Sequence, residues 1–257
     1  METVVIKIGG ALITDKSKPF SIRYNILNRL AHEISRAYKE CCSRVLVVHG
    51  GGSFGHYVVA EHGSVNTVEA IVQTAWFMKE LNMIVVDALM LYGVPAVSFD
   101  IHAITVVQGE GIYLYLEPIS RALELGLVPV LYGDIAIGDK VRVISGDEVA
   151  WYLSSYFSPS KLLFATAVDG VYDRNPSDPK AKLLDTVTLN DIHNILFSES
   201  QGIDVTGGMK LKLELALKYA SNGINDVVIF NGLKEGQTYS AICGRLTRCT
   251  RVLLYEY

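Results

Sequence analysis

The residue types and spacing of a glycine-rich stretch at residues 49–56, HGGGSFGH, are typical of a loop that binds an anion. Gly50, Gly52 and Gly55 match the G-x-G-x-x-G pattern of dinucleotide-binding loops. The same stretch matches a Walker A loop until His56 replaces the lysine. Because glycines let the backbone approach an anion closely, we expect a phosphate group to bind here.

Neither nucleotide-binding motif fits its surroundings. A dinucleotide fold needs a second strand about 30 residues further on, with an acidic residue at its end, whereas residues 65–92 have one long helical pattern. A Walker A loop needs a lysine and a hydroxyl residue, and both are missing. We expect Ser53 to cap a helix and His56, in its first turn, to donate to the anion. The alternative is a purely structural histidine.

A second stretch, KIGGALITDK at residues 7–16, combines lysines with glycines. Lys7 lies inside an apolar strand, where burial is costly unless the ammonium group meets an anion. Gly9 and Gly10 follow it, and Lys16 lies in the polar loop beyond. The stretch indicates another phosphate site; the alternative is a lysine that reaches solvent from an edge strand.

A third glycine-bearing helix start is DVTGGMKLK, residues 204–212, where Thr206, Gly207 and Gly208 precede Lys210 and Lys212. Three such starts with lysines nearby indicate a phosphate-rich pair of substrates.

Acidic residues stand at two other loops. Asp147 and Glu148 open a helix in SGDEVA, where the simplest role is to complement the helix dipole. Asp169, Tyr172 and Asp173 follow a strand in FATAVDGVYDRNP, and could contact a nucleotide's base, ribose or metal.

β-branched apolar runs alternate with helical patterns, which predicts a mainly parallel sheet with helices on both faces. Two hairpins are also expected, one over residues 134–144 and one including 111–117, and RCTRVLLYEY predicts a last strand, paired antiparallel. In this class of fold, ligands bind at the carboxyl ends of the strands. The predicted strands are 3–8, 44–49, 94–99, 127–132, 161–166 and 226–231, and the predicted helices are 22–41, 65–92, 117–125, 146–156 and 208–222.

The bulk composition excludes several classes of protein. With 257 residues, 50% of them hydrophobic and 19% charged, the chain can form one large ordered domain. A net charge of −4 gives no sign of a nucleic-acid surface. Because the N-terminus does not resemble a signal peptide and charges interrupt the most apolar segment, we expect a cytoplasmic protein without a membrane span.

The four cysteines lack the spacing of metal ligands, so we expect reduced thiols at Cys41, Cys42, Cys243 and Cys249. No other residue is predicted to be a metal ligand.

Taken in order, KIGGALITDK, HGGGSFGH, SGDEVA, VDGVYDRNP and DVTGGMKLK resemble the amino acid kinase superfamily, and within it most closely the isopentenyl phosphate kinases. The resemblance covers essentially the whole chain. The histidine that ends the second stretch is shared with fosfomycin-resistance kinases but not with aspartate, acetylglutamate or uridylate kinases. The resemblance implies an α/β fold, a three-layer αβα sandwich around an open, mainly parallel sheet. It further implies a homodimer of single-domain chains, with an acceptor-binding half at about residues 1–158 and a nucleotide-binding half at about 159–257.

The resemblance also implies a reaction, in which ATP with Mg²⁺ phosphorylates isopentenyl phosphate to isopentenyl diphosphate in isoprenoid biosynthesis by an alternative mevalonate pathway. Lys7 and Lys212 would bind the transferring phosphoryl group and the β-phosphate, Asp147 would hold both lysines, and Lys16 would stabilise the transition state. Residues implied to contact ATP are Gly9, Gly10, Ala11, Gly52 and Gly208 at the phosphates, and Thr166, Asp169, Gly170, Tyr172 and Asp173 at the nucleoside. Residues implied to hold the acceptor phosphate are Gly51, Gly52, Ser53, Gly55, His56 and Gly133.

Two alternatives stay open at this point. One is a kinase for another small phosphate or phosphonate, such as fosfomycin, and the other is a non-catalytic nucleotide sensor. Family members often have aspartate where this chain has Ala167, which puts a nucleotide contact there in doubt. Apolar residues that could line the acceptor's tail are Ile71, Ala75, Trp76, Met78, Leu81, Met83, Phe99 and Ile104.

Overall fold

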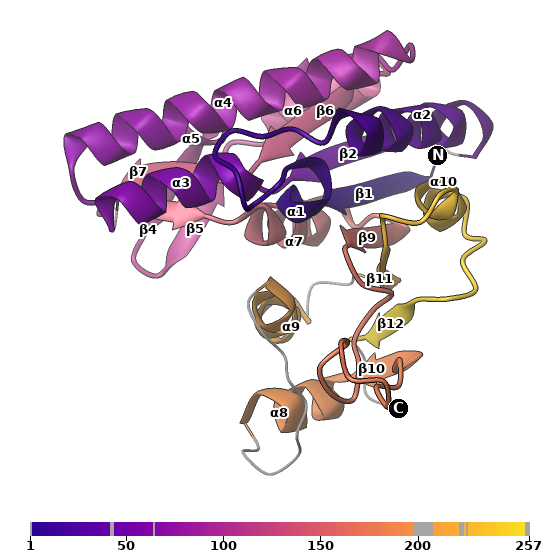
Figure 1. The fold of residues 1–257 in the computed structure, drawn as a ribbon. Coiled ribbons are helices and arrows are strands. Elements are labelled where there is room, and N and C mark those ends of the chain that lie inside the picture. Colours follow the sequence, from indigo (N-terminus) through magenta and orange to yellow (C-terminus); the bar gives the residue numbers. More distant parts are fainter. Residues whose placement is uncertain are drawn as a thin grey trace.

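The fold is built on one eight-stranded sheet that runs through the whole molecule (Figure 1). The computed structural model describes residues 2–41, 44–63, 65–197, 208–220, 224 and 226–254, and at positions 56 and 59 the backbone alone. In sheet order the strands are β10 (Thr186–Thr188), β12 (Thr250–Leu253), β11 (Val227–Asn231), β9 (Lys161–Thr166), β1 (Thr3–Ile8), β2 (Arg44–His49), β6 (Val128–Tyr132) and β3 (Ala96–Ser98).

The pairing of these strands confirms the predicted, mainly parallel sheet. The strands β11, β9, β1, β2, β6 and β3 are all parallel, and β12 pairs antiparallel with β11 and parallel with β10. The central strands are almost entirely buried, which explains their continuous apolar sequence. Because β1 pairs with both β2 and β9, the sheet is continuous across residue 158; the division into two functional halves stays a prediction.

Helices cover both faces of the sheet, as an αβα sandwich requires. One core contains residues of α2, α4 and α10, and the other contains residues of α6, α7, α8 and α9. Figure 1 shows α2 and α4 on one side of β1 and β2, with α7 on the other. The helices are α1 (Gly10–Ile13), α2 (Tyr24–Glu40), α3 (Gly52–His62), α4 (Val68–Leu91), α5 (Ile101–Ile104), α6 (Glu117–Glu124), α7 (Gly146–Phe157), α8 (Leu189–Phe197), α9 (Gly208–Tyr219) and α10 (Gln237–Ile242).

A smaller four-stranded sheet confirms both predicted hairpins. Its strands, in order, are β5 (Gly111–Leu114), β4 (Thr105–Gln108), β7 (Asp134–Gly138) and β8 (Arg142–Ile144). The pairs β4·β5 and β7·β8 are antiparallel, so the sheet consists of two hairpins joined side by side through β4 and β7. No described helix is long and apolar enough to cross a membrane.

The structure departs from the sequence-based prediction at the ends of elements and at short elements. The predicted helix over 65–92 begins at Val68, because the Thr67 hydroxyl caps it by accepting from the Ala70 amide. Strand β10 was not predicted, since a three-residue strand carries no measurable periodicity, and the nine-residue helix α8 was not predicted either.

The prediction of reduced thiols was wrong for two of the four cysteines. Cys41 ends α2, Cys243 ends α10, and the two form a disulfide across 202 residues of chain. No local spacing could reveal this pairing, because packing of α10 on α2 creates it. Cys249 is a free, buried thiol, and Cys42 lies outside the described residues.

Candidate active site

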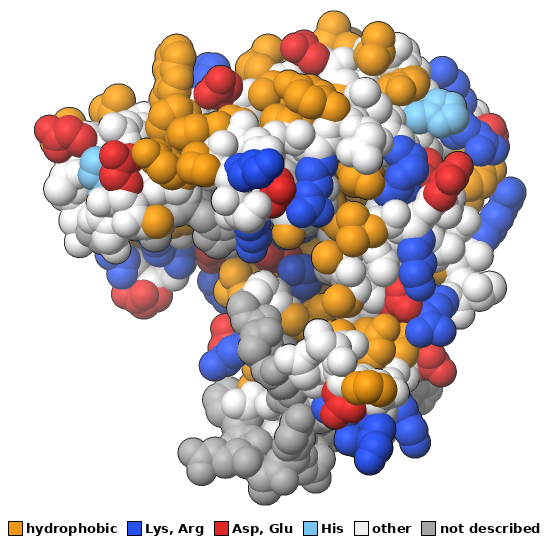
Figure 2. All heavy atoms as spheres, in the orientation of Figure 1, with side chains coloured by type: hydrophobic (Ala, Val, Ile, Leu, Met, Phe, Trp, Pro, Cys, Tyr) orange, Lys and Arg blue, Asp and Glu red, His pale blue; other side chains and the backbone are white. Residues whose placement is uncertain are grey.

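A cavity of about 850 Å³ opens at the carboxyl ends of β1, β2, β6 and β9. Its walls come from the loops that follow these strands and from the first turns of α3, α7 and α9. In Figure 2 the molecule is hollowed between the part that carries α3 and α4 and the part that carries α9. The carboxyl-end location predicted for the ligand site is thus where the cavity lies.

The most concentrated charge in the cavity is a buried cluster of Lys7, Asp147 and Lys212. Lys7 Nζ donates to Asp147 Oδ2 at 3.0 Å, and Lys212 Nζ lies 3.1 Å from Asp147 Oδ1. Lys212 Nζ also donates to the Gly208 carbonyl at 3.0 Å. All three side chains are less than a tenth exposed and line the cavity. One carboxylate therefore holds two ammonium groups, one from β1 and one from α9, at the same site.

Burial and mutual charge set the protonation of this cluster. Burial disfavours the carboxylate of Asp147, but the charges of Lys7 and Lys212 outweigh that cost and lower its pKa. Burial, followed by repulsion from Lys7 and Lys16, lowers the pKa of Lys212 to about 8, although Asp147 opposes the shift. Lys16 itself is exposed and lines the same cavity. The cluster has excess positive charge, which suits the binding of an anion.

The glycines of the loops allow the loops to touch one another. A Cβ atom on Gly10 would lie 2.2 Å from the Gly52 amide nitrogen, and one on Gly133 would lie 2.7 Å from the Gly146 nitrogen. Gly52 has φ of +50°, a conformation that favours glycine. These glycines are needed for backbone contact between loops as well as for access by an anion. The cavity is lined by Gly9, Gly10, Ala11, Gly50, Gly51, Gly52, Gly55, Gly133, Gly146 and Gly208.

The predicted acceptor residues are only partly where we expected them. Gly51, Gly52, Gly55 and Gly133 line the cavity, but Ser53 does not. Helix α3 begins at Gly52, so Ser53 is inside the helix rather than capping it. Its amide donates to Thr14 Oγ1, so the amide is not left for an acceptor, and its hydroxyl accepts from the Ser21 amide. The side chain of His56 lies outside the described residues.

Few of the apolar residues proposed for the acceptor's tail reach the cavity. Met78 lines it, beside Gly51 and Gly55, and Thr74, Val143 and Ile144 are also among the residues that line the cavity. Leu81 is a core residue, whereas Trp76 is 67% exposed on the outer face of α4. The helical pattern had not distinguished the inward face of α4 from its solvent face.

The nucleoside residues divide into two groups. Thr166, Gly170 and Tyr172 line the cavity, together with Ala167 and Val168, and their contact with the nucleoside stays a prediction. Asp169 and Asp173 do not line the cavity, and the nucleotide contacts predicted for them stay predictions. Asp169 pairs with Lys234 and Arg248, and Asp173 accepts from the Lys182 amide and pairs with Arg174.

Two members of the third glycine stretch, Thr206 and Gly207, lie outside the described residues. Lys210, from the same stretch, pairs with Glu214 on the surface.

Sequence reasoning missed a buried acid in the wall of the cavity. Asp134 follows Gly133 directly, is 1% exposed and lines the cavity. Its Oδ2 lies 2.7 Å from His102 Nδ1. Burial raises the pKa of Asp134, and the hydrogen bond that the His102 ring donates to Asp134 raises the pKa of His102. The position of an acid after an apolar strand could have indicated Asp134, but only the fold brings His102 to it.

A second polar network lies behind the acceptor loop. His49 Nε2 lies 3.1 Å from Asn82 Oδ1, and the Asn82 amide donates to the Ser98 hydroxyl at 2.5 Å. Full burial lowers the pKa of His49 to about 4, so the ring is neutral at physiological pH. The network ties the end of β2 to α4 and β3. It fixes where the glycine-rich loop begins.

The chain forms an α/β sandwich with a cavity at the carboxyl ends of its parallel strands. This cavity combines a lysine–aspartate–lysine cluster with glycine-rich helix starts. Together these features define a phosphate-handling enzyme of the nucleotide-dependent class. The chain belongs to the amino acid kinase family, whose model matches residues 2–231. It is 36% identical to an isopentenyl phosphate kinase of Methanocaldococcus jannaschii, over 94% of this chain and 95% of that protein. It is 35% identical to an isopentenyl phosphate kinase of Methanothermobacter thermautotrophicus, over 97% and 98% of the two chains.

Solved structures agree with this assignment. A crystal structure of an isopentenyl phosphate kinase superposes with a TM-score of 0.83 at 33% identity, covering 97% of this chain and 99% of that one. UMP kinase from Ureaplasma parvum, at 20% identity, superposes with a TM-score of 0.69 over 98% of both chains, and shows the shared fold alone.

Proposed function

We propose that the protein transfers the γ-phosphoryl group of ATP to a phosphate oxygen of isopentenyl phosphate, giving ADP and isopentenyl diphosphate for isoprenoid biosynthesis. The observation that carries this proposal is the Lys7–Asp147–Lys212 cluster, which lines the same cavity as the glycine-rich loops and the loop after β9. Relatives over 33% identical along nearly the whole chain, named isopentenyl phosphate kinases, support the choice of acceptor.

The cluster suits phosphoryl transfer between two anions. In-line transfer requires the two phosphates to be brought together and their charge to be neutralised. Lys7 and Lys212 would bind the transferring phosphoryl group and the β-phosphate of ATP, and Asp147 would keep both ammonium groups in place. Lys16, exposed at the same cavity, would neutralise charge that builds up in the transition state.

The acceptor would occupy the other end of the cavity. The backbone at Gly51, Gly55 and Gly133 would contact its phosphate, and Thr74, Met78 and Ile144 would contact its tail. His56, near the start of α3, would donate to the same phosphate. Because the attacking atom is already an anionic oxygen, no residue is needed to remove a proton.

We also propose that ATP enters with Mg²⁺ bound to its phosphates. Within the described residues, no group of three His, Cys, Asp or Glu is arranged to hold a metal ion. The carboxylates that line the described cavity, Asp134 and Asp147, are already paired with His102 and with the two lysines. We therefore assign no protein ligand and no catalytic step to the ion. Chelation with EDTA should abolish turnover.

We propose a cytoplasmic homodimer as the working form. Val68, Val72 and Trp76 are each at least 60% exposed and recur every fourth residue along α4. Figure 2 shows hydrophobic side chains exposed over the part of the molecule where α4 runs. An apolar stripe of this kind is typical of a surface that a second copy covers. Light scattering should give the dimer mass, and Trp76→Glu should give the monomer mass.

A panel of acceptors tests the proposed reaction. Isopentenyl phosphate, dimethylallyl phosphate, fosfomycin and UMP are each incubated with enzyme, ATP and Mg²⁺, and ADP release is measured. The proposal expects the highest kcat/KM with isopentenyl phosphate. Preference for fosfomycin would replace it with a phosphonate kinase, and ATP binding without ADP release from any acceptor would favour a nucleotide sensor.

A further inference from the structure

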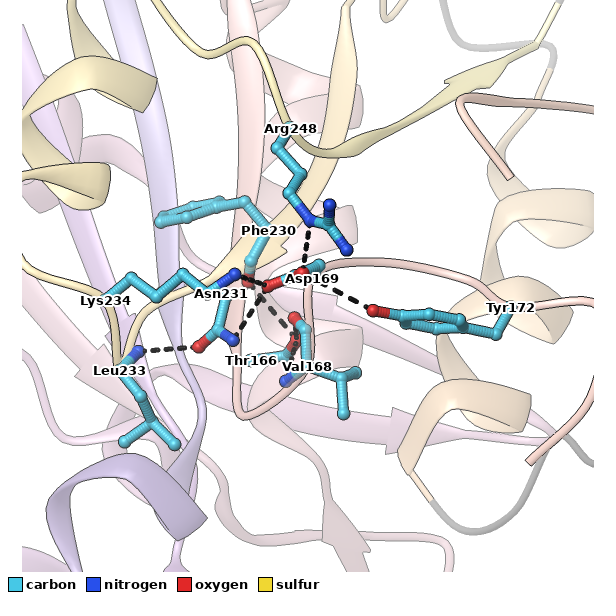
Figure 3. A network of polar contacts seen from close by, with 9 residues as sticks. All are labelled: Thr166, Val168, Asp169, Tyr172, Phe230, Asn231, Leu233, Lys234 and Arg248. Carbon is cyan, nitrogen blue, oxygen red and sulfur yellow. Dashed lines mark hydrogen bonds and ion pairs between the residues drawn. The ribbon is translucent and has the colours of Figure 1, made fainter. Parts of the chain in front are cut away.

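Asp169 is the centre of a polar network on the nucleoside side of the molecule (Figure 3). Its Oδ1 accepts from the Asn231 amide at 2.9 Å and lies 2.7 Å from Lys234 Nζ. Its Oδ2 accepts from Arg248 Nε at 2.5 Å and from the Tyr172 hydroxyl at 3.4 Å. Both oxygens are therefore fully engaged by protein groups.

Three of these partners are far from Asp169 in the chain. Asn231 ends β11, Lys234 lies in the loop after it, and Arg248 lies in the loop that leads into β12. Figure 3 shows all of them converging on the loop after β9, which carries Asp169. One carboxylate thus joins three loops at the same edge of the sheet.

The side chain of Asp169 and its neighbouring backbone have different surroundings. The Asp169 side chain is 8% exposed and does not line the cavity. Its neighbours Val168 and Gly170 both line the cavity, as does Tyr172. The loop therefore presents its backbone and Tyr172 to the cavity, while the Asp169 carboxylate is held against the rest of the protein.

A second set of contacts fixes the same loop beyond Asp169. The Val171 amide donates to Thr250 Oγ1 at 2.8 Å, and a Cβ atom on Gly170 would lie 2.2 Å from that oxygen. On the other side of Asp169, the Thr166 hydroxyl donates to the Val168 carbonyl at 2.7 Å. With both flanks fixed in this way, the Asp169 network determines where the middle of the loop lies.

We infer that Asp169, with Lys234 and Arg248, is a positioning clamp that holds the nucleoside wall of the cavity in place without touching the nucleotide. The clamp sets the affinity for ATP through Val168, Gly170 and Tyr172. It leaves the reacting phosphates and the acceptor unaffected. The inference rests on the proposed function only in taking ATP as the bound nucleotide.

Binding of ATP, measured by calorimetry without any acceptor, tests the clamp. Asp169→Asn keeps the shape of the side chain but removes its charge, and should weaken ATP binding by about tenfold. Lys234→Met and Arg248→Met leave Asp169 in place and should each weaken it by about threefold, because both cations are half exposed. In turnover assays the same variants should raise KM for ATP and leave KM for the acceptor and kcat within about twofold.

Asp226→Asn is a matched control. Asp226 lies just before β11 and forms an ion pair with Arg251 of β12, so it also links segments on this side of the sheet, but it does not line the cavity. The same change of charge there should leave ATP binding unaltered. Equal loss in this control would show a general effect on stability and would overturn the clamp.

Other results would separate positioning from direct contact. If Asp169→Asn weakens ATP binding while Lys234→Met and Arg248→Met do not, the carboxylate contacts the nucleotide and the clamp is wrong. If no variant changes ATP binding, the clamp is also wrong. Should Asp169→Asn fail to fold, ATP binding by Lys234→Met and Arg248→Met still tests whether the clamp is right. Absence of turnover with isopentenyl phosphate, with ATP binding that still follows the variants, would refute the proposed reaction and leave the clamp standing.

Discussion

Lys7 Nζ lies 3.0 Å from Asp147 Oδ2, although 140 residues separate the two in the chain. The contact joins the end of the central strand β1 to the first turn of α7. Lys212 approaches the other carboxylate oxygen from α9, so the aspartate fixes two cations at once. A buried charge cluster of this kind is costly unless all its members are present.

Asp147→Asn should therefore affect both turnover and stability. With the carboxylate gone, two buried lysines repel each other, and we expect the free energy of unfolding to fall by about 3 kcal/mol. The misplaced ammonium groups should lower kcat by at least about tenfold. Denaturant unfolding and steady-state kinetics measure the two effects.

Glu148→Gln is the control for this variant. Glu148 is the next residue in α7, is similarly buried and pairs with Arg142 and Lys218, but it does not line the cavity. Its loss should reduce stability while kcat stays within about twofold. An equal loss of kcat in both variants would mean that the role of Asp147 is structural only.

The pH dependence of kcat/KM for ATP should show the titration of Lys212. Its pKa is lowered to about 8, and only the protonated ammonium attracts phosphate. As pH rises through about 8 the charge is lost, so kcat/KM for ATP should fall. Lys212→Arg keeps the charge at higher pH and should remove this alkaline decrease. A flat profile up to pH 10 in the unaltered enzyme would contradict the assignment.

His56→Ala should lower kcat/KM for isopentenyl phosphate by at least about tenfold, because the acceptor phosphate loses a charge-assisted donor. His62, at the end of the same helix, contacts Gln73 rather than the cavity. His62→Ala is thus the matched variant, with kinetics close to those of the unaltered enzyme. If both variants behave alike, His56 does not hold the acceptor.

Reduction of the Cys41–Cys243 disulfide should destabilise the fold. The bridge closes a loop of 202 residues between α2 and α10, and its loss should cost about 2–4 kcal/mol of unfolding free energy. Thermal melts with and without reductant measure this change. The Cys41→Ser/Cys243→Ser variant should melt as the reduced protein does and should not respond to reductant; a response would point to another thiol.

Much of the fold could be predicted from the sequence, because buried parallel strands and amphipathic helices leave local patterns. The strands around β1 and the helices α2, α6 and α7 lie within a few residues of their predicted positions. Lys7 was identified for the same reason, since a lysine in an apolar strand is costly without a partner. Short elements such as β10 carry too few residues for such a pattern.

The site could be predicted only in part, because a local motif does not reveal which way a side chain points. VDGVYD places Asp169 beside the cavity in sequence, yet tertiary contacts with Lys234 and Arg248 turn its carboxylate away. SFGH suggested a cap at Ser53, yet the hydroxyl of Thr14, 39 residues earlier, takes its amide. His102 was not found at all, because nothing near it in sequence indicates Asp134.

By itself, the sequence determined the chemistry available to this protein: lysines and glycines at strand ends, in the order that resembles the amino acid kinases. The tertiary structure decided which of those groups meet. Lys7, Asp147 and Lys212 converge because parallel strands end at the same edge of the sheet, and Cys41 meets Cys243 because α10 packs on α2. Such pairings depend on the packing of segments up to about two hundred residues apart, which no local pattern contains.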